Sequence, residues 1–546
     1  MLREPVDLGQ SRKMTQPATL IEIEIALAAN DIAKAADLAE AALTAGELHP
    51  LILNLAAWKR EEVRDFAGAQ TLLESALRLA PDDPHVRVGL GAVLRKQGRT
   101  EEAISLLRGV VQQYPGISAA WLELGYALDA SGVFEAAVAH YERAAELDPH
   151  IAAPHGMLAS LLARTGKMVE ARETADVALA LDACNAAALM ARARCDLADK
   201  DNAAVQTAMV SLTQRTDVSL EEQVLALQLL GDALDQCGDA KAAFDAYSRS
   251  KALFCELDPN EEHQAQRAFV ERILASIEQV PAHGIVPSNM SKKGCVAANH
   301  AFLLGFPRSG TTLVENILTS LKNVEALEER PTLAEADKAF LLPADGIEKL
   351  AACGTIEADR LRNSYWDYVA ASGVNARDKL FVDMDPMKGI KLPVIARLFP
   401  DAKIIVMRRD PREVVWSCFK TGFAKTSAAF EFTTLERAAL HYDAVMRLTE
   451  ASLERFPLVV FNLRYDALVT DFEATTKALC TFLEIPWSDE VRAFSKTANR
   501  RGVSTASAIQ VRQGLYDGRG QWLRYEDEMS GALAILAPWV KRLGFA

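Results

Sequence analysis

The segment from residue 300 to 321 of this 546-residue chain has the residue types and spacing of an anion-binding site. Its pattern predicts a short buried strand over 301–304, a loop over 305–310 and a helix over 311–320. The loop reads Gly-Phe-Pro-Arg-Ser-Gly, and two threonines follow it. Such a loop points backbone N–H groups and the helix dipole at an anion. We therefore predict a phosphate or sulfonate site; a tight turn without a ligand is the alternative.

The loop resembles a Walker A loop in spacing but not in its basic residue. Gly305 and Gly310 keep the Gly-x-x-x-x-Gly spacing, while Thr311 occupies the position of the Walker lysine. That lysine normally reaches the β- and γ-phosphates, so its absence argues against a P-loop kinase or nucleotidase. Arg308 instead offers a planar fork suited to one terminal phosphate or sulfonate.

The stretch Phe-Pro-Arg-Ser-Gly-Thr-Thr, followed by a helix, also carries a family resemblance. It resembles the 5′-phosphosulfate loop of sulfotransferases that use PAPS (3′-phosphoadenosine 5′-phosphosulfate). The Arg-Ser-Gly-Thr-Thr form is similar to tyrosylprotein sulfotransferases and to bacterial proteins that join tetratricopeptide repeats to a sulfotransferase domain. The resemblance implies that the 5′-phosphosulfate is bound by Arg308, Ser309, Gly310, Thr311 and Thr312.

The resemblance implies a second site, for the 3′-phosphate, built from an arginine at a strand end and a serine on the next helix. Residues 403–407 form an apolar strand, Arg409 follows it, and Ser417 lies eight residues further on. The family's Arg-Asp-x-Arg pattern falls on Arg409, Asp410, Pro411 and Arg412. An arginine that merely pairs with a carboxylate is the alternative.

Two later segments resemble those that cover the nucleotide in this family. Tyr465 opens a Tyr-Asp-Ala-Leu-Val stretch and lies either against the nucleotide or in the core. Residues 504–522 are similar to the closing segment, in which Ser507, Gln510 and Arg512 match a Ser-x-x-Gln-Val element and its next residue. The resemblance implies that Ser507 assists at the bridging oxygen and that the other two contact the nucleotide. Surface residues without a ligand are the alternative.

Sulfuryl transfer needs a base for the acceptor hydroxyl and a cation for the departing phosphate. The family base is a carboxylate after the first loop and its helix, and ungapped counting places it on Glu329. As a general base it must reach the acceptor proton. Many relatives have glycine before this residue, whereas this chain has Glu328. Two adjacent carboxylates in a solvated turn are the alternative.

One position departs from the family's Asp-Lys-x-Pro-x-Asn element. This chain reads Asp383-Met384-Asp385-Pro386-Met387-Lys388, with methionine in place of the lysine. A thioether cannot stabilise a leaving phosphate. Either Lys388 or Arg308 takes that role, or the domain is slow, differently specific or inactive. An inactive domain would make the protein a non-catalytic adaptor with a degenerate PAPS-binding domain.

The N-terminal half that precedes these motifs has a 34-residue period. Prolines, glycines and alanines recur on it: Pro81, Pro115 and Pro149; Gly98, Gly132 and Gly166; Ala35, Ala69, Ala103, Ala137 and Ala171. Small residues allow close helix contact, glycine supplies the turn, and proline ends the second helix. The pattern resembles the tetratricopeptide repeat. It predicts six or seven repeats with an insertion near 214–222.

We predict an all-α superhelical repeat array followed by an α/β, P-loop-like domain with a parallel sheet of the sulfotransferase type. The predicted domains are an N-terminal tail (1–18), the repeats (19–256), a connecting helix and linker (257–295) and the sulfotransferase-like domain (296–546). The concave face of the array is expected to dock a peptide or protein partner; oligomerisation or scaffolding is the alternative, and the oligomeric state is left open.

Composition narrows the function classes further. The net charge of −14 disfavours nucleic acid as a partner, although a small basic pocket remains compatible with it. No apolar run is long enough for a transmembrane segment, and without an export signal we expect a cytoplasmic protein. The eight cysteines and nine histidines show no metal-ligand spacing, so no metal is expected. The leading interpretation is PAPS-dependent sulfuryl transfer to a tyrosine, carbohydrate or small phenol.

Overall fold

A computed structural model describes residues 18–29, 31–257, 266–281, 285, 296–501, 511 and 514–545. Nearly all of the predicted tail, most of the linker, and Ser507, Gln510 and Arg512 lie outside these residues. Packing divides the chain into two compact units, Met1–Arg192 and Ala193–Ala546. The predicted boundaries near 256 and 295 follow the sequence pattern and stay predictions.

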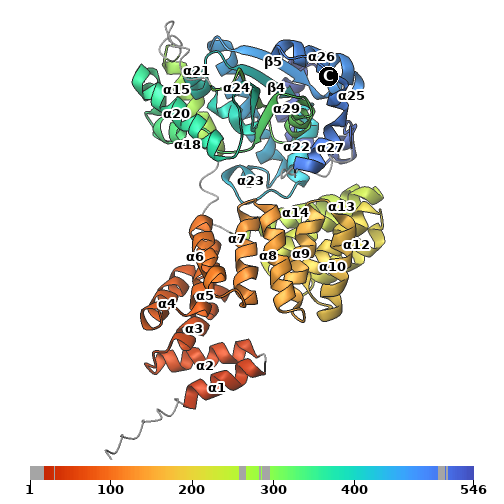
Figure 1. Cartoon of the computed structure of the whole chain (residues 1–546). Coiled ribbons are helices and arrows are strands. Elements are labelled where there is room, and N and C mark those ends of the chain that lie inside the picture. Colours follow the sequence, from red (N-terminus) through yellow and green to blue (C-terminus); the bar gives the residue numbers. More distant parts are fainter. Residues whose placement is uncertain are drawn as a thin grey trace, which may run out of the picture. The chain divides into compact units, whose positions relative to one another are not determined.

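The N-terminal half consists of paired helices, as the 34-residue period predicted (Figure 1). The helices are α1 (Ala18–Ala28), α2 (Ile32–Thr44), α3 (Pro50–Glu62), α4 (Phe66–Leu79), α5 (Pro84–Lys96), α6 (Thr100–Gln113), α7 (Ser118–Ala130), α8 (Phe134–Leu147), α9 (Ala152–Arg164), α10 (Met168–Leu181), α11 (Ala186–Ala198), α12 (Asn202–Thr213), α13 (Leu220–Cys237) and α14 (Ala240–Glu256).

Glycine has two roles in the repeats, one in the turns between helices and one inside a helix. Gly98 and Gly132 lie in the turns between paired helices with φ of 78° and 77°, which other residues rarely adopt. Gly125 lies inside α7, where a Cβ would be 2.5 Å from the ring of the buried Tyr141. Close helix packing therefore requires its missing side chain.

The predicted insertion appears as a lengthened helix. The first helices of the preceding pairs have 13 residues each (α5, α7, α9 and α11), whereas α13 has 18. Its start is fixed by a reciprocal capping box between Ser219 and Glu222. The added residues explain why the glycines of this repeat lie four positions off the earlier period.

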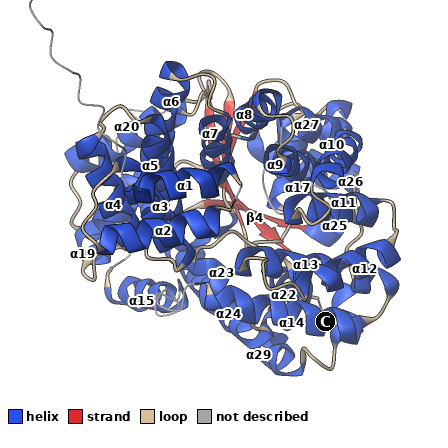
Figure 2. Cartoon of the chain, turned by 90° about the horizontal axis from the view of Figure 1, so that it is seen from below, coloured by secondary structure: helices blue, strands red, loops and turns tan. Residues whose placement is uncertain are grey.

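The second unit contains a five-stranded parallel sheet in the order β2-β3-β1-β4-β5. Its strands, red in Figure 2, are β1 (Asn299–Leu304), β2 (Val324–Glu328), β3 (Leu380–Met384), β4 (Lys403–Arg408) and β5 (Val459–Arg464). The helices that adjoin them are α15 (Gln266–Gln279), α17 (Thr311–Thr319), α18 (Ala334–Ala336), α19 (Gly346–Ala351), α20 (Thr355–Ala371), α21 (Leu392–Leu398), α22 (Pro411–Lys420), α23 (Ser427–Glu431), α24 (Leu435–Arg455), α25 (Tyr465–Thr470), α26 (Phe472–Leu483), α27 (Phe494–Arg501) and α29 (Ser530–Arg542).

Both faces of the sheet are covered, because successive residues of each strand enter different cores. Phe302 and Leu304 of β1 join a core with α20, α22, α24 and α29. Ala301 and Leu303 join a second core with α17, α26 and α27. This two-sided burial explains the continuous apolar runs of the strands in the sequence.

The parallel arrangement brings the predicted motifs to one edge of the sheet. The loop of Arg308 follows β1, Glu329 follows β2, and Asp385 follows β3. Arg409 lies one residue beyond β4, and Tyr465 follows β5. Ligands of open α/β sheets bind at this carboxyl edge. All five strands therefore contribute to the edge where a site is expected.

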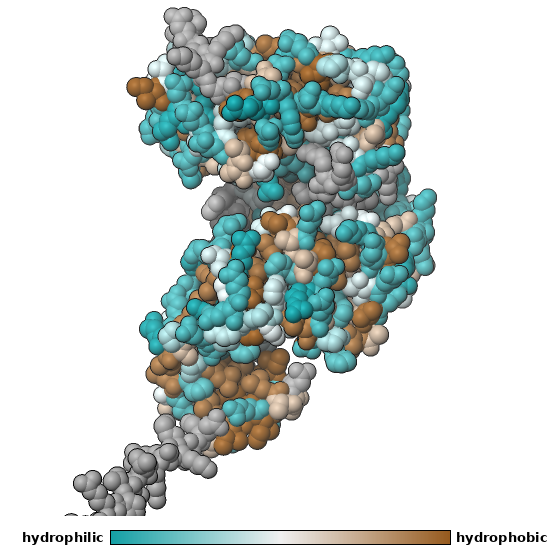
Figure 3. All heavy atoms as spheres, viewed as in Figure 1, coloured by the Kyte–Doolittle hydropathy of each residue, from teal (hydrophilic) through white to brown (hydrophobic). Residues whose placement is uncertain are grey.

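Apolar side chains gather over the N-terminal helices in the face shown in Figure 3. The large apolar residues exposed in α1, α2 and the turn that follows include Ile21, Ile25, Ile32 and Leu48. Within the described part of the chain, no helix combines the length and the apolar composition that a membrane span requires.

We predict opposite effects for two helical glycines of neighbouring repeats. Gly125→Ala places a methyl group against Tyr141 and should cost about 1–3 kcal/mol, as overpacking does. Gly109→Ala, at an exposed position of α6 with open space around it, should instead stabilise by about 0.5–1 kcal/mol. Urea unfolding followed by circular dichroism measures both. Equal midpoints for the two variants would contradict the close contact between α7 and α8.

Candidate active site

The loop after β1 holds its arginine in an unusual backbone conformation. Arg308 has φ of 69° and Gly310 has φ of 109°. A Cβ on Gly310 would lie 2.8 Å from the ring of Tyr465, so this position requires glycine. A left-handed non-glycine residue costs about 1–3 kcal/mol and is typical of functional sites. The fold therefore stabilises this loop at the expense of local strain.

The residues at the start of α17 present buried polar atoms. Ser309, Thr311 and Thr312 are only 1–3% exposed. The hydroxyl of Ser309 has no hydrogen-bond partner among the described residues. An unsatisfied buried hydroxyl costs about 1–3 kcal/mol. A phosphate or sulfonate oxygen at the helix start would satisfy it, so the arrangement fits an anion.

The two predicted anion-binding elements contact each other through one hydrogen bond. The Nε of Arg308 donates to the Oγ of Ser417 on α22 at 3.0 Å. Burial, together with the positive charge of the neighbouring Arg409, lowers the pKa of Arg308 to about 10. Arg308 therefore stays protonated at neutral pH and brings a positive charge to both elements.

Arg409 bridges the anion loop and the closing segment. It donates to the carbonyl oxygens of Arg308 at 2.9 Å and of Gly518 at 3.1 Å. Its Nε is buried with no hydrogen-bond partner in the described part of the chain, and its guanidinium carbon lies 4.6 Å from the ring centroid of Tyr465. By contrast, the neighbouring Arg408 pairs with a carboxylate, since its Nη2 lies 2.6 Å from Oε1 of Glu450.

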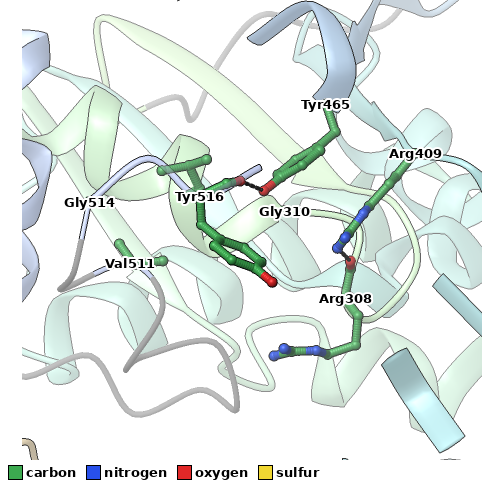
Figure 4. Close-up of a pocket in the computed structure, with 8 residues that line it drawn as sticks. Arg308, Gly310, Arg409, Tyr465, Val511, Gly514 and Tyr516 are labelled. Atoms are coloured by element: carbon green, nitrogen blue, oxygen red, sulfur yellow. Dashed lines mark hydrogen bonds between the residues drawn. The ribbon is translucent and has the colours of Figure 1, made fainter. Parts of the chain in front are cut away.

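A cavity opens beside these groups, with an empty volume of about 400 Å³ that includes its open mouth (Figure 4). It is lined by Arg308, Gly310, Leu313, Arg409, Tyr465, Val511, Gly514 and Tyr516. The hydroxyl of Tyr465 donates to the carbonyl of Tyr516 at 2.6 Å and ties the closing segment to the cavity wall. Tyr465 is 7% exposed and belongs to the core as well as to the cavity wall.

Glu329 lies at the neighbouring strand end in a second left-handed conformation, with φ of 47°. Its N–H donates to the carbonyl of Met384 at 2.7 Å, which fixes the turn against β3. The residue is solvent-accessible, but the protein packed around its carboxyl, with Asp385 and Glu328, raises its pKa to about 7. Positive charge on Lys388 and Arg308 opposes this rise. Glu329 and Arg308 thus belong to one electrostatic site.

A buried polar network lies under the Glu329 turn. Lys388 is fully buried, and its ammonium is hydrogen-bonded to Asp383. The other oxygen of Asp383 accepts from Thr332 at 2.8 Å and from Tyr365 at 2.9 Å. Because the proton of Tyr365 goes to Asp383, the Nε2 of His300 donates to the phenol oxygen across 2.8 Å. Thr332 thereby anchors the turn that carries the carboxylate.

Met384 has the environment of a core residue. It is fully buried in the core that contains α17 and α27. The side chain that replaces the family lysine therefore serves packing. The ammonium of Lys388 forms an ion pair with Asp383, and it lies 4.0 Å from the carboxylate of Asp385.

Family comparisons agree with this geometry. The sulfotransferase family model matches residues 301–489, which span the anion loop, Glu329 and Arg409. Two tetratricopeptide repeat models match residues 62–125 and 122–188. The chain joins tetratricopeptide repeats to a sulfotransferase-family domain. The predicted architecture is thus confirmed.

Individual relatives are distant. A protein of Aquifex aeolicus described as uncharacterized is 28% identical over 328 residues, 58% of this chain and 41% of its own length. Protein-tyrosine sulfotransferase A of Caenorhabditis elegans is 24% identical, covering 45% of this chain and 66% of its own. Protein-tyrosine sulfotransferase 1 of Danio rerio is 24% identical, covering 45% and 71%. This chain thus covers less than half of the length of the A. aeolicus protein and about two thirds of the length of the other two relatives.

Among solved structures, the repeats are similar to a thermophilic tetratricopeptide protein of Thermus thermophilus. The identity is 20% and the TM-score is 0.30, over 33% of this chain and 98% of that one.

The sulfotransferase-family site contains most of the residues predicted from sequence. Arg308, Ser417, Arg409 and Tyr465 are connected by direct contacts, and Glu329 adjoins them electrostatically. Sequence reasoning missed Tyr516 and Asp385, although both lie inside motif segments. Nothing in the spacing indicated that Tyr516 would offer its carbonyl to Tyr465 or that Asp385 would raise the pKa of Glu329.

The donor set suits an anionic nucleotide. Two arginines line the cavity, and the buried hydroxyl of Ser309 and the Nε of Arg409 lack partners. These groups are hydrogen-bond donors, which phosphate and sulfonate oxygens require. Among the described residues, no group of His, Cys, Asp and Glu has an arrangement that could hold a metal ion.

We predict that Lys388→Met destabilises the domain by about 3–5 kcal/mol, because Asp383 would keep a buried charge without its partner. The double variant Lys388→Met, Asp383→Asn removes both charges and should recover most of the lost stability. Chemical unfolding of the three proteins, followed by tryptophan fluorescence, measures this. A double variant no more stable than the single one would contradict the pairing.

Proposed function

We propose that this protein is a sulfotransferase that uses PAPS and modifies a hydroxyl group. The main support is the unpartnered, buried Oγ of Ser309 at the start of α17, beside the Arg308 guanidinium. An anion at this point would contact the hydroxyl, the helix N–H groups and a fixed positive charge. The sulfotransferase family match supports the same assignment.

In this proposal PAPS supplies an activated sulfuryl group. Arg308, Ser309, Gly310, Thr311 and Thr312 bind its 5′ end by resemblance and by their position before α17. Arg409 and Ser417 bind the 3′-phosphate, and Tyr465 forms a wall of the nucleotide cavity. Ser507, Gln510 and Arg512 keep their predicted roles as expectations.

Glu329 is the proposed general base. A base acts best when its pKa is near the working pH, and the pKa of about 7 meets this condition. The Glu329 carboxylate accepts the acceptor proton. The Met384–Glu329 hydrogen bond and the Thr332–Asp383 bond hold its turn in place.

Arg308 is the proposed cation for the leaving phosphate. Sequence reasoning left this role open between Arg308 and Lys388. Lys388 is fully buried and its ammonium is committed to Asp383, whereas Arg308 lines the cavity. A bound phosphate therefore meets Arg308 without rearrangement of the buried pair.

A protein tyrosine is the acceptor we favour, presented by a partner bound to the repeats. The names of the C. elegans and D. rerio relatives support tyrosine, and tetratricopeptide arrays offer extended concave binding surfaces. Carbohydrate and small phenols are the competing acceptors.

The competing proposal is an adaptor that binds PAPS without transferring sulfate. The burial of Met384 favours it, since the family lysine is replaced by a side chain that packs in the core. The two proposals differ only in transfer, so a transfer assay separates them.

We predict that the full chain binds adenosine 3′,5′-bisphosphate in calorimetry and prefers it to ATP. Arg308→Ala should weaken this binding about 10–100-fold, because a charged hydrogen-bond donor is lost. Arg360→Ala, which removes an exposed arginine paired with Glu357 on α20, should leave it unchanged. Binding of ATP alone would overturn the PAPS assignment in favour of a P-loop nucleotide enzyme.

We also predict transfer of labelled sulfate from PAPS to a protein in a host lysate. Glu329→Ala should lower the rate about 10²–10⁴-fold, the range for loss of a general base, with little change in nucleotide binding. Transfer to glycans or small phenols alone would replace the tyrosine acceptor. Nucleotide binding without any transfer would establish the adaptor.

The transfer rate should rise with pH through a midpoint near 7, because only ionised Glu329 accepts a proton. Asp385→Asn removes a negative charge that raises this pKa, so the midpoint should move to lower pH. Asp401 precedes β4, at the opposite edge of the sheet, so the control variant Asp401→Asn should keep the wild-type pH profile. A profile of kcat/KM that stays unchanged in Asp385→Asn would exclude Glu329 as the titrating base.

A further inference from the structure

The last repeat packs directly on the helix that carries the proposed 3′-phosphate site, and both lie in the second unit. Tyr247 of α14 makes an edge-to-face contact with Trp416 of α22, with ring centroids 6.1 Å apart. Phe244 lies 5.4 Å from Phe419 in the same interface. Tyr247 also belongs to the core that includes β1 and β4 residues. The repeat and the sheet domain thus share one hydrophobic core here.

Asp235, near the end of α13, makes the main polar contact across this interface. Its Oδ1 accepts the hydroxyl of Tyr525 at 2.5 Å and lies 2.8 Å from Arg524 Nη2. Arg524 also donates to the Asp235 carbonyl at 2.9 Å. The other carboxylate oxygen lies 3.4 Å from the ammonium of Lys420. One carboxylate therefore holds three side chains from two separate segments.

These two segments form parts of the proposed donor site. Lys420 ends α22, the helix that carries Ser417. Arg524 and Tyr525 lie in the short helix Gln521–Tyr525, directly after the segment in which Tyr516 lines the cavity and Gly518 binds Arg409. Asp235 thus contacts the end of α22 and the short helix that follows the cavity-lining segment.

Further contacts fix the end of α22 against the same repeat. Lys251 of α14 is buried and donates to the carbonyl of Thr421, which caps α22, at 2.6 Å. A cation at a helix C-terminus is favoured by the helix dipole. Gln228 of α13 donates to the carbonyl of Lys420. Thr421 in turn donates to the carbonyl of Ser417 at 2.6 Å. These hydrogen bonds connect the repeat to Ser417, which we propose to bind the 3′-phosphate.

We infer that Asp235 is a positioning residue of the donor site, supplied by the repeat array. This inference rests on the proposed function. It means that the last repeat sets donor affinity by holding α22 and the closing segment in their relative positions. Asp235 touches neither the cavity nor Glu329, so it acts through Ser417 and Tyr516. Its loss weakens donor binding and leaves the chemical step intact.

Asp235→Ala in the full chain tests this inference. The Kd for adenosine 3′,5′-bisphosphate and the KM for PAPS should both rise about tenfold, equivalent to about 1.4 kcal/mol, with kcat little changed. Hydrogen exchange should become faster in residues 411–421 and 514–525. Asp235→Asn keeps an acceptor for Tyr525 but loses the charge facing Arg524 and Lys420, so its effect should be smaller in the same direction.

Asp239→Asn is the matched control. Asp239 lies four residues further on in the same repeat and caps α14 by accepting from the Ala242 N–H. Asparagine caps helices as well as aspartate, so binding, kinetics and exchange should match the wild type.

The possible outcomes separate the two proposals. Wild-type binding that Asp235→Ala leaves unchanged overturns the inference and keeps the proposed function. A fall in kcat alone also overturns the inference. A wild type that fails to bind the nucleotide overturns the proposed function and the inference with it, whereas normal wild-type binding with unchanged exchange in Asp235→Ala overturns the inference alone.

Discussion

The whole site depends on the parallel direction of five strands. Because all carboxyl ends meet at one edge, residues from distant parts of the sequence become neighbours, from Arg308 after β1 to Tyr465 after β5. An antiparallel strand would move its motif to the opposite edge. The covered faces of the sheet make this arrangement rigid, and the strained turns at Arg308 and Glu329 are supported by it.

The distribution of buried charge explains how the site accommodates Met384. Lys388 and Asp383 neutralise each other beneath the edge, and Thr332 and Tyr365 complete the hydrogen bonds of the carboxylate. A buried pair with satisfied hydrogen bonds is tolerated, whereas a lone charge is not. Positive charge at the cavity comes from Arg308 and Arg409.

The sequence was informative wherever function depends on local spacing. The 34-residue period predicted the helix pairs, and the strand–loop–helix pattern placed Arg308 in the loop between β1 and α17. It was less informative about contacts made through the tertiary fold. Whether Lys388 faces the cavity or Asp383 depends on how β3 and its following turn pack, which no spacing records. The left-handed turn at Glu329 was also invisible, because glutamate carries no signal for it. The roles of Ser507, Gln510 and Arg512 stay predictions.

The contact between the last repeat and α22 changes how the two parts of the chain should be regarded. A flexible tether would leave the sulfotransferase-family domain independent of the array. Instead, Tyr247 and Trp416 lie in one core, and Asp235 contacts Lys420 at the end of α22 and Tyr525 after the closing segment. A core that includes both elements cannot loosen at one without affecting the other. The final repeat is therefore part of the fold that holds α22 at the carboxyl edge of the sheet.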